Sequence, residues 1–335
     1  MFIVENYPVA ILLCTITMLC WGSWGNTQKL AAKSWRYELF YWDYVAGIVL
    51  VALILGFTLG SFGGQGRSFI EDLAQVDSTN FRSAFTGGVI FNAANILLSA
   101  AVALAGMSVA FTVGVGLALV IGVFVNYFAT PKGDPSALFI GVALVVAAII
   151  INGIASGRVS KSSDQDRSAK KGLMLAIMAG VLMSFFYRFV AAAMDLDNFV
   201  SPTPGMATPY SAFFIFALGI LASNFIFNTL VMKKPFAGAP VNYKQYLTGG
   251  FNTHMVGILG GVIWGTGTLF SYIAAGKAGA AISYALGQGA PMIAALWGIF
   301  IWKEFKGGPG SNNALLTIMI VLFLSGLGVI VYAGL

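Results

Sequence analysis

Ten long apolar runs follow one another along the chain, and each has the length of a membrane-spanning helix. A span needs about 20 mostly apolar residues, and these runs are rich in Leu, Ala, Gly and Phe. They lack the alternation of polar and apolar residues that marks barrel strands. We therefore predict an all-α integral membrane protein with ten transmembrane helices. The helices are predicted at residues 8–28, 39–60, 84–105, 108–129, 136–156, 172–194, 208–232, 253–275, 279–302 and 312–334.

Charged residues make up only 9% of the 335 residues, and the mean hydropathy is +0.86. Soluble domains carry about 25% charged residues, so this chain cannot cover a surface that faces water. The sequence shows no nucleotide-binding loop and no nucleophile motif, and its single histidine, His254, argues against a histidine-based metal site. We expect neither enzymatic activity nor a metal or cofactor. The net charge of +6 reports membrane topology rather than nucleic-acid binding.

Lysine and arginine are unequally divided between the two sides of the predicted bundle. Cytoplasmic loops carry the excess of these residues, so we predict that both termini lie outside and that the polar linker 157–171 lies in the cytoplasm. Arg188 falls inside a helix. The four on the side of the N-terminus are Arg67, Arg82, Lys132 and Lys277. The 13 on the other side are Lys29, Lys33, Arg36, Arg158, Lys161, Arg167, Lys170, Lys171, Lys233, Lys234, Lys244, Lys303 and Lys306.

The linker divides the chain into two similar halves. Residues 87–122 align without a gap on residues 260–295, 173 positions later, with nine of 36 residues identical. Because each half has an odd number of spans, the second half enters the membrane upside down, as in the inverted repeats of secondary transporters. A chance resemblance between helices rich in glycine and alanine is the alternative. We predict two five-helix domains, 1–156 and 172–335, with a solute site between them near the middle of the membrane.

Several segments resemble a known family of transporters. The stretch "GGVIFNAANILLSAAVALAGMSVAFTVGVGLALVIGVFVNYF" resembles the third and fourth helices of plant ureide permeases. "YWDY" at 41–44 resembles the start of their second helix, "PYSAFFIF" at 209–216 the start of their seventh, and "APMIAALWGIFIWKEF" the end of their ninth. Those proteins belong to the drug/metabolite transporter superfamily, whose bacterial glucose/ribose porters and rhamnose–proton symporters this chain also resembles. The plant proteins carry a long central loop with a nucleotide-binding-like stretch, for which the linker 157–171 is too short.

The resemblance implies ten helices in two inverted halves and the import of small neutral polar solutes, often with a proton. We predict a secondary transporter that imports a monosaccharide of the ribose or rhamnose type by proton symport and alternating access. A ureide or nucleobase such as allantoin or uracil is the alternative solute, and export of metabolites or drugs is the alternative direction. The short linker fits a bacterial inner-membrane protein, expected as a monomer or weak homodimer whose partners are the solute and the lipid bilayer.

Polar and aromatic side chains recur at helical spacing inside the predicted spans. Polar groups are costly in lipid and usually face the protein interior. A carboxamide donates and accepts together, which suits a solute's hydroxyls or its N–H and C=O groups, and an indole face suits a flat ring or the C–H face of a sugar. Hydrogen bonds between helices, at about 0.6 kcal/mol each, are the alternative role. The predicted solute-binding residues are Trp21, Trp24, Gln28, Asn92, Asn95, Trp264, Thr268, Tyr272, Tyr284 and Gln288. The residue 173 positions before Gln288 is Val115, an asymmetry expected when a symmetric scaffold holds an asymmetric solute.

Two ionisable residues inside the predicted helices are candidates for ion coupling. Asp43 begins the second helix among aromatic residues, and a carboxylate facing the membrane interior is a natural proton carrier. An interfacial anchor, or an ion pair with Arg188 or Lys29, is the alternative role. Arg188 cannot release its proton, so its contribution is expected to be electrostatic. A sodium ion held by oxygen ligands is the alternative to the proton.

Overall fold

Helices form the framework of the structure, a computed structural model that describes residues 1–32, 34–158, 166–303, 305 and 310–335. Within these residues, ten helical stretches are long and apolar enough to cross a membrane, which confirms the all-α class and the number of spans. Residues 159–165 of the predicted linker lie outside the described part, as do Lys33 and Lys306.

The spans follow the predicted order, and several of them are built from more than one helix. The first half contains α1 (Tyr7–Ser23), α2 (Gly25–Ala31), α3 (Tyr37–Phe57), α4 (Phe69–Gln75), α5 (Ser78–Ala110), the π-helix η1 (Phe111–Val115), α6 (Gly116–Ala129) and α7 (Pro135–Gly157). The second half contains α8 (Asp166–Ala192), α9 (Pro209–Lys233), α10 (Tyr243–Leu247), α11 (Phe251–Ala278), α12 (Ala280–Gly287), α13 (Ala290–Leu296), the π-helix η2 (Trp297–Ile301) and α14 (Ser311–Tyr332).

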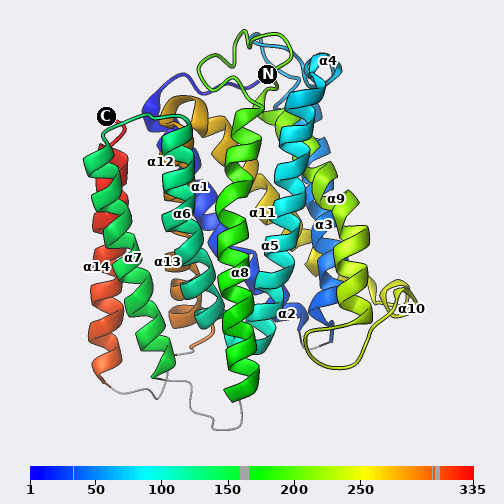
Figure 1. Ribbon diagram of the computed structural model, residues 1–335, viewed down its shortest axis with the longest axis vertical. Helices are drawn as coiled ribbons and strands as arrows, with labels where there is room; N and C mark the ends of the chain where they lie inside the picture. Colours follow the sequence, from blue (N-terminus) through cyan, green and yellow to red (C-terminus); the bar gives the residue numbers. More distant parts are fainter. Residues whose placement is uncertain (33, 159–165, 304, 306–309) are drawn as a thin grey trace.

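Local sequence explains where several helices begin. The side chains of Asn6 and Asp134 cap α1 and α7 by accepting hydrogen bonds from backbone N–H groups in the first turn. Pro135 and Pro209 occupy the first positions of α7 and α9, where a missing N–H has no cost. The helices pack side by side into one bundle, with both chain termini and α4 at one end and with α2 and α10 at the other (Figure 1). We name these the α4 end and the α10 end.

Two glycines with the same unusual backbone mark equivalent turns in the two halves. Gly106, where α5 kinks, has φ 81°, and Gly279, between α11 and α12, has φ 82°. A positive φ is accessible to glycine without steric cost, so each position permits a turn between two spans with almost no loop. The two residues are 173 positions apart, which is the spacing of the sequence repeat.

Helix crossings at glycine repeat in the same symmetric manner. A Cβ atom at Gly88 on α5 would lie 2.1 Å from the Phe216 carbonyl oxygen and 3.0 Å from the Gly219 Cα on α9. A Cβ atom at Gly261 on α11 would lie 1.9 Å from the Tyr44 carbonyl oxygen and 2.9 Å from the Gly47 Cα on α3. The crossing of α5 with α9 therefore has its counterpart in the crossing of α11 with α3, as two inverted halves require.

The short helices α4 and α10 obey the same relation at opposite ends of the bundle. Each follows the second span of its half, and each begins with a capping box, from Ser68 and Glu71 in α4 and from Asn242 and Gln245 in α10. The repeat therefore extends beyond the spans into their connections.

The crossing glycines give a first prediction. Alanine at Gly261 should lower stability by about 1–3 kcal/mol, because its methyl group would collide with the Tyr44 carbonyl oxygen. Gly328→Ala is the matched control, since Gly328 also lies within a helix, α14, and has no neighbouring atom within 4 Å. There we expect no loss. Thermal unfolding of both variants in detergent tests the difference, and equal midpoints would contradict the role of the crossing.

Candidate functional site

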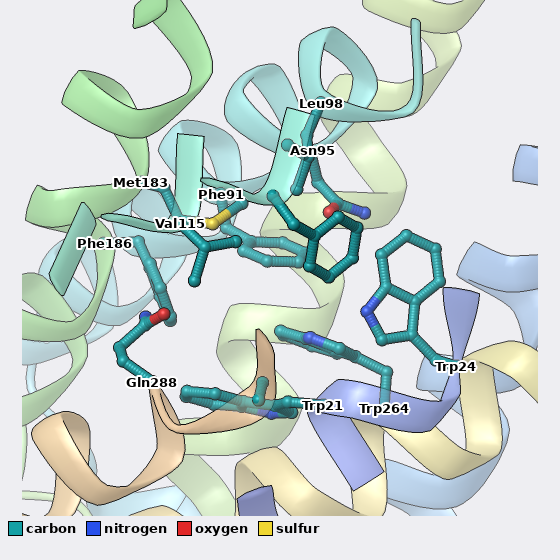
Figure 2. Close-up of a pocket in the computed structure, with 12 residues that line it drawn as sticks. Trp21, Trp24, Phe91, Asn95, Leu98, Val115, Met183, Phe186, Trp264 and Gln288 are labelled. Atoms are coloured by element: carbon teal, nitrogen blue, oxygen red, sulfur yellow. The ribbon is translucent and has the colours of Figure 1, made fainter. Parts of the chain in front are cut away.

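A small cavity of about 40 Å³ lies where the two halves meet, near the middle of the spans. It is bounded by α1, α5, η1, α8 and α11 and by the break between α12 and α13 (Figure 2). The volume suits water rather than a solute of monosaccharide or nucleobase size, so a solute of that size requires the walls to move apart. The lining residues are Trp21, Trp24, Phe91, Asn95, Leu98, Phe111, Val115, Met183, Phe186, Trp264, Gln288 and Ala290.

Aromatic rings form most of the cavity wall and are arranged as a stack. The ring centroids of Phe91 and Trp264 are 4.2 Å apart with an interplanar angle of 25°, and Trp21 continues the stack at 6.2 Å and 10° from Trp264. Phe91 and Trp264 are 173 positions apart, and so are Val115 and Gln288. Since both pairs of equivalent residues line one cavity, the cavity lies on the axis that relates the two halves.

Two carboxamides supply the polar part of the lining. Asn95 on α5 is 1% exposed, and its Nδ2 donates to the Tyr41 hydroxyl at 3.2 Å. Gln288 is placed at the cavity by a break in the ninth span, where α12 ends at Gly287 and Gln288 itself has a ψ of 1°. Figure 2 shows the two carboxamides on opposite sides of the cavity. Either amide offers both a donor and an acceptor to a solute.

Four of the predicted solute-binding residues lie behind the cavity wall. The Thr268 hydroxyl accepts a hydrogen bond from Nε1 of Trp21 at 3.0 Å, so Thr268 positions that indole. Nδ2 of Asn92 donates to the Ser223 hydroxyl at 2.9 Å and joins α5 to α9. The Tyr284 hydroxyl donates to the Ala118 carbonyl oxygen at 3.0 Å. Tyr272 is fully buried, and its hydroxyl has no partner among the residues that the structure describes.

Gln28 lines a second, larger cavity of about 680 Å³ at the α10 end. This cavity lies between α2, the connection from α2 to α3, the lower part of α5 and the loop before α10. Its wall residue Val102 is one helical turn beyond Leu98 of the small cavity, so the two cavities are neighbours along α5. Lys29 lies in the same wall, with its ammonium nitrogen 4.4 Å from the Trp302 ring centroid.

A network at the α4 end joins the connection after α3 to the connection before α9. Nε of Arg67 donates to Asp72 at 2.8 Å, and its terminal nitrogens donate to the carbonyl oxygens of Pro202 and Met206. Asp72 is fully buried and also accepts from the Thr208 N–H at 2.7 Å. Hydrogen bonds therefore join the two halves at the α4 end, where a cavity of about 220 Å³ lies beside Gly279, and the cavity at the α10 end is about three times larger.

An arginine also fastens part of the α10 end. Arg36 forms an ion pair with the fully buried Glu38 and donates to the carbonyl oxygens of Ala237 and Ala239 in the loop before α10. In each network an arginine of the first half binds loop carbonyls of the second half. The loops joined at the α10 end are the inverted counterparts of those joined at the α4 end.

The two residues predicted for ion coupling lie far apart. Asp43 is in the second turn of α3 at the α10 end, whereas Arg188 is near the end of α8 toward the α4 end. Asp43 contacts His254, Tyr246 and Trp35 instead. Within the described part of the chain, Arg188 makes no ion pair or side-chain hydrogen bond. The ion pair between Asp43 and Arg188, one of the alternatives considered from the sequence, is therefore absent from the described part of the structure.

Seven cavity residues were not predicted from the sequence. Phe91 carried a usable signal, because it lies four positions before Asn95 and therefore on the same helix face. Val115 was singled out only as the counterpart of Gln288. The other five are Leu98, Phe111, Met183, Phe186 and Ala290, which are ordinary apolar residues of membrane helices and carry no distinguishing signal.

Comparison with known proteins shows similarity to one family of transporters along most of the chain. The model of the ureide permease family matches residues 40–171 and again residues 161–333, one match for each half. Ureide permease 1 and ureide permease 2 of Arabidopsis thaliana are 23% and 25% identical, each over 98% of this chain and 98% of their own length. The putative sugar uptake protein YxfA of Lactococcus lactis is 22% identical over 94% of this chain and 95% of its own. A solved crystal structure with 16% identity superposes with a TM-score of 0.62 over 97% of this chain and 98% of its own, which shows the shared fold.

The network at the α4 end gives a second prediction. Arg67→Gln should lower stability by about 1.5–3 kcal/mol, because the fully buried Asp72 side chain loses its charged hydrogen-bond donor. Adding Asp72→Asn should restore part of this loss, since the charge is removed while an oxygen remains for the Thr208 N–H. Thermal unfolding of the single and double variants measures both effects. A double variant no more stable than Arg67→Gln would argue against a buried charge as the cause.

Proposed function

The chain belongs to the ureide permease family, and from this premise we propose that it imports a small neutral polar solute by proton symport and alternating access. It is a membrane transporter rather than an enzyme. The observation that carries the proposal is the cavity on the axis between the inverted halves, which is lined by both halves and lies between the hydrogen-bonded network of the α4 end and a larger cavity at the α10 end. A solute site that opens alternately to the two sides belongs in this place.

The chemistry of the lining favours a flat ring with N–H and C=O groups on its edge, such as a ureide or nucleobase. Desolvating a hydroxyl or amide without giving it a new partner costs about 1–3 kcal/mol. A monosaccharide carries hydroxyls around its whole ring, and the cavity offers only two polar side chains, Asn95 and Gln288, among six aromatic rings. A planar heterocycle has two bare faces for the stack of Phe91, Trp264 and Trp21 and concentrates its polar groups where the carboxamides are.

A monosaccharide, the solute expected from the sequence, remains the second candidate. One of the relatives is described as a putative sugar uptake protein, and indole faces also accept the C–H face of a sugar. Neutral carboxamides and aromatic rings support a neutral solute in either case. The alternatives to proton-coupled import are export and coupling to sodium.

Uptake into proteoliposomes tests the solute and the direction together. We expect labelled uracil or allantoin to accumulate under an imposed inward proton gradient and ribose or rhamnose to accumulate at least tenfold less. If ribose or rhamnose accumulates more than uracil and allantoin, the transported solute is a sugar. Accumulation driven by a sodium gradient instead would identify sodium as the coupling ion. If none of the four solutes accumulates, symport of these solutes is overturned.

The two carboxamides test the site itself. Asn95→Ala and Gln288→Ala should each weaken binding of the transported solute about tenfold, because each removes hydrogen bonds worth about 1.4 kcal/mol. Asn312→Ala is the matched control: Asn312 is also a buried amide bonded to a backbone carbonyl, that of Ala155, but it lies on α14 away from the cavity. The half-saturating concentration for counterflow is the measurement. If a variant binds the solute with wild-type affinity, the substituted residue is not part of the solute site.

The orientation proposed for a bacterial inner membrane places the α4 end outside, because the sequence assigns four Lys and Arg residues to the side of the N-terminus and 13 to the other side. In a background without Cys14 and Cys20, Gly64→Cys at the α4 end should react with a membrane-impermeant maleimide in intact cells. Lys244→Cys, on the exposed face of α10, should react only after lysis. The opposite labelling pattern would reverse the orientation.

A further inference from the structure

A buried carboxylate lies at the α10 end, where four segments of the chain meet. Asp43 on α3 is 2% exposed. Its Oδ1 accepts from the Tyr246 hydroxyl at 2.7 Å and lies 2.8 Å from Nδ1 of His254, and its Oδ2 accepts from Nε1 of Trp35 at 3.3 Å. These partners come from α10, from α11 and from the connection between α2 and α3. The carboxylate therefore joins four segments that are distant in the sequence.

His254 connects this carboxylate with the water at the α10 end. Its side chain is 22% exposed, so the imidazole contacts Asp43 on one side and is accessible on another. The rings of Trp35 and Tyr246 meet it edge to face, at 5.3 Å and 4.9 Å between centroids. A substituent at Gly249 would come within 2.7 Å of Nε2, so only the bare glycine leaves room for the ring.

Among the residues that the structure describes, two ionisable groups contact His254. They are Asp43 from α3 and Tyr246 from α10. Burial and the hydrogen bond to Asp43 raise the pKa of Tyr246 well above its ordinary value, so its hydroxyl stays protonated as a donor. Of the other charges at this end, Arg36 and Glu38 pair with each other, and Lys244 on α10 is exposed.

One turn of α3 joins this cluster to the solute cavity. The Tyr41 hydroxyl accepts the hydrogen bond from Asn95 of the cavity lining, and the Tyr44 ring packs against Trp24 at 4.9 Å between centroids. Asp43 lies between Tyr41 and Tyr44 in the sequence. A shift of this turn therefore changes the contacts of Asp43 and the cavity wall together.

The cluster has no counterpart at the α4 end. Gly47 on α3 and Gly219 on α9 occupy equivalent crossings and are 172 positions apart. With this offset, the residue of α9 equivalent to Asp43 is Ile215. The offset of 173 between α5 and α11 pairs His254 with Phe81. An otherwise symmetric scaffold thus carries an acid and a base at the α10 end and two apolar side chains at the α4 end.

We infer that Asp43 and His254 together bind the transported proton, and that the turn of α3 between Tyr41 and Tyr44 couples this proton to the solute cavity. The inference rests on the proton symport proposed above. The empty site is a carboxylate with a neutral imidazole and has a net charge of −1. One proton converts it into a carboxylate–imidazolium pair of net charge zero, which is less costly to bury. The present state, with its larger cavity at the α10 end, is the one from which the proton leaves toward that end.

The single histidine permits a direct test on the wild-type protein. In protein labelled with ¹⁵N-histidine and purified through a histidine-free tag, the imidazole signals belong to His254 alone. We expect the pH response of these signals to differ between wild type and Asp43→Asn, because the partner charge next to the imidazole is removed. Asn252→Gln is the control, because Asn252 is exposed and lies two positions before His254 on α11. This variant should leave the curve unchanged. Identical curves for wild type and Asp43→Asn would overturn the paired site.

Transport supplies the second arm. In proteoliposomes with labelled uracil and allantoin, His254→Gln and Asp43→Asn should lose at least tenfold of the gradient-driven accumulation while counterflow remains measurable. Asn252→Gln should accumulate like wild type. Wild-type accumulation in His254→Gln would overturn the inference. Absence of counterflow in the wild type would instead refute the proposed function for these solutes, and the imidazole titration would still decide whether Asp43 and His254 act as a pair.

Discussion

Close contact between helix backbones is the constraint on which the rest of this structure depends. In lipid there is no hydrophobic drive for helices to associate, so packing between small residues holds a bundle together. Gly88 against Gly219 and Gly261 against Gly47 bring two pairs of helices to backbone contact. These crossings place the middle of α5 opposite the middle of α11, and the stack of Phe91 on Trp264 follows from that placement. The solute cavity is thus a consequence of where the glycines are.

Much of the fold could be predicted from the sequence because its determinants are local or periodic. A span is determined by its own 20 residues, and the number of spans was correct. The inverted repeat was visible because Gly106 and Gly279 must both be glycine for backbone reasons and are therefore matched in the alignment. Of the candidate site, Trp21, Trp24, Asn95, Trp264 and Gln288 reach the cavity lining. A tryptophan or an amide in mid-span stands out against leucine and alanine.

The rest of the candidate site depends on contacts that sequence does not encode in a readable form. Phe186 lines the cavity and Phe185, its neighbour, is exposed, and nothing but the packing of α8 distinguishes them. Asn92 and Asn95 are both buried amides on one helix, yet one binds Ser223 and the other faces the cavity. The partner of Asp43 is 211 residues away in the chain, and the sequence offered Arg188 and Lys29 as equally plausible partners.

Departures from symmetry carry the functional argument. A perfectly repeated scaffold would present the same surface to both sides of the membrane. Here the equivalent pairs Gln288 and Val115, and Asp43 and Ile215, differ in polarity while the glycines that hold the helices together are kept. The scaffold is therefore symmetric at the helix crossings and asymmetric where the proposed solute and proton sites lie. Since Tyr41 and Tyr44 touch the cavity residues Asn95 and Trp24 from the turn that holds Asp43, both proposed sites contact the same few residues of α3. Coupling then requires no signal across the bundle, only that this turn adopts one position when both sites are filled and another when both are empty.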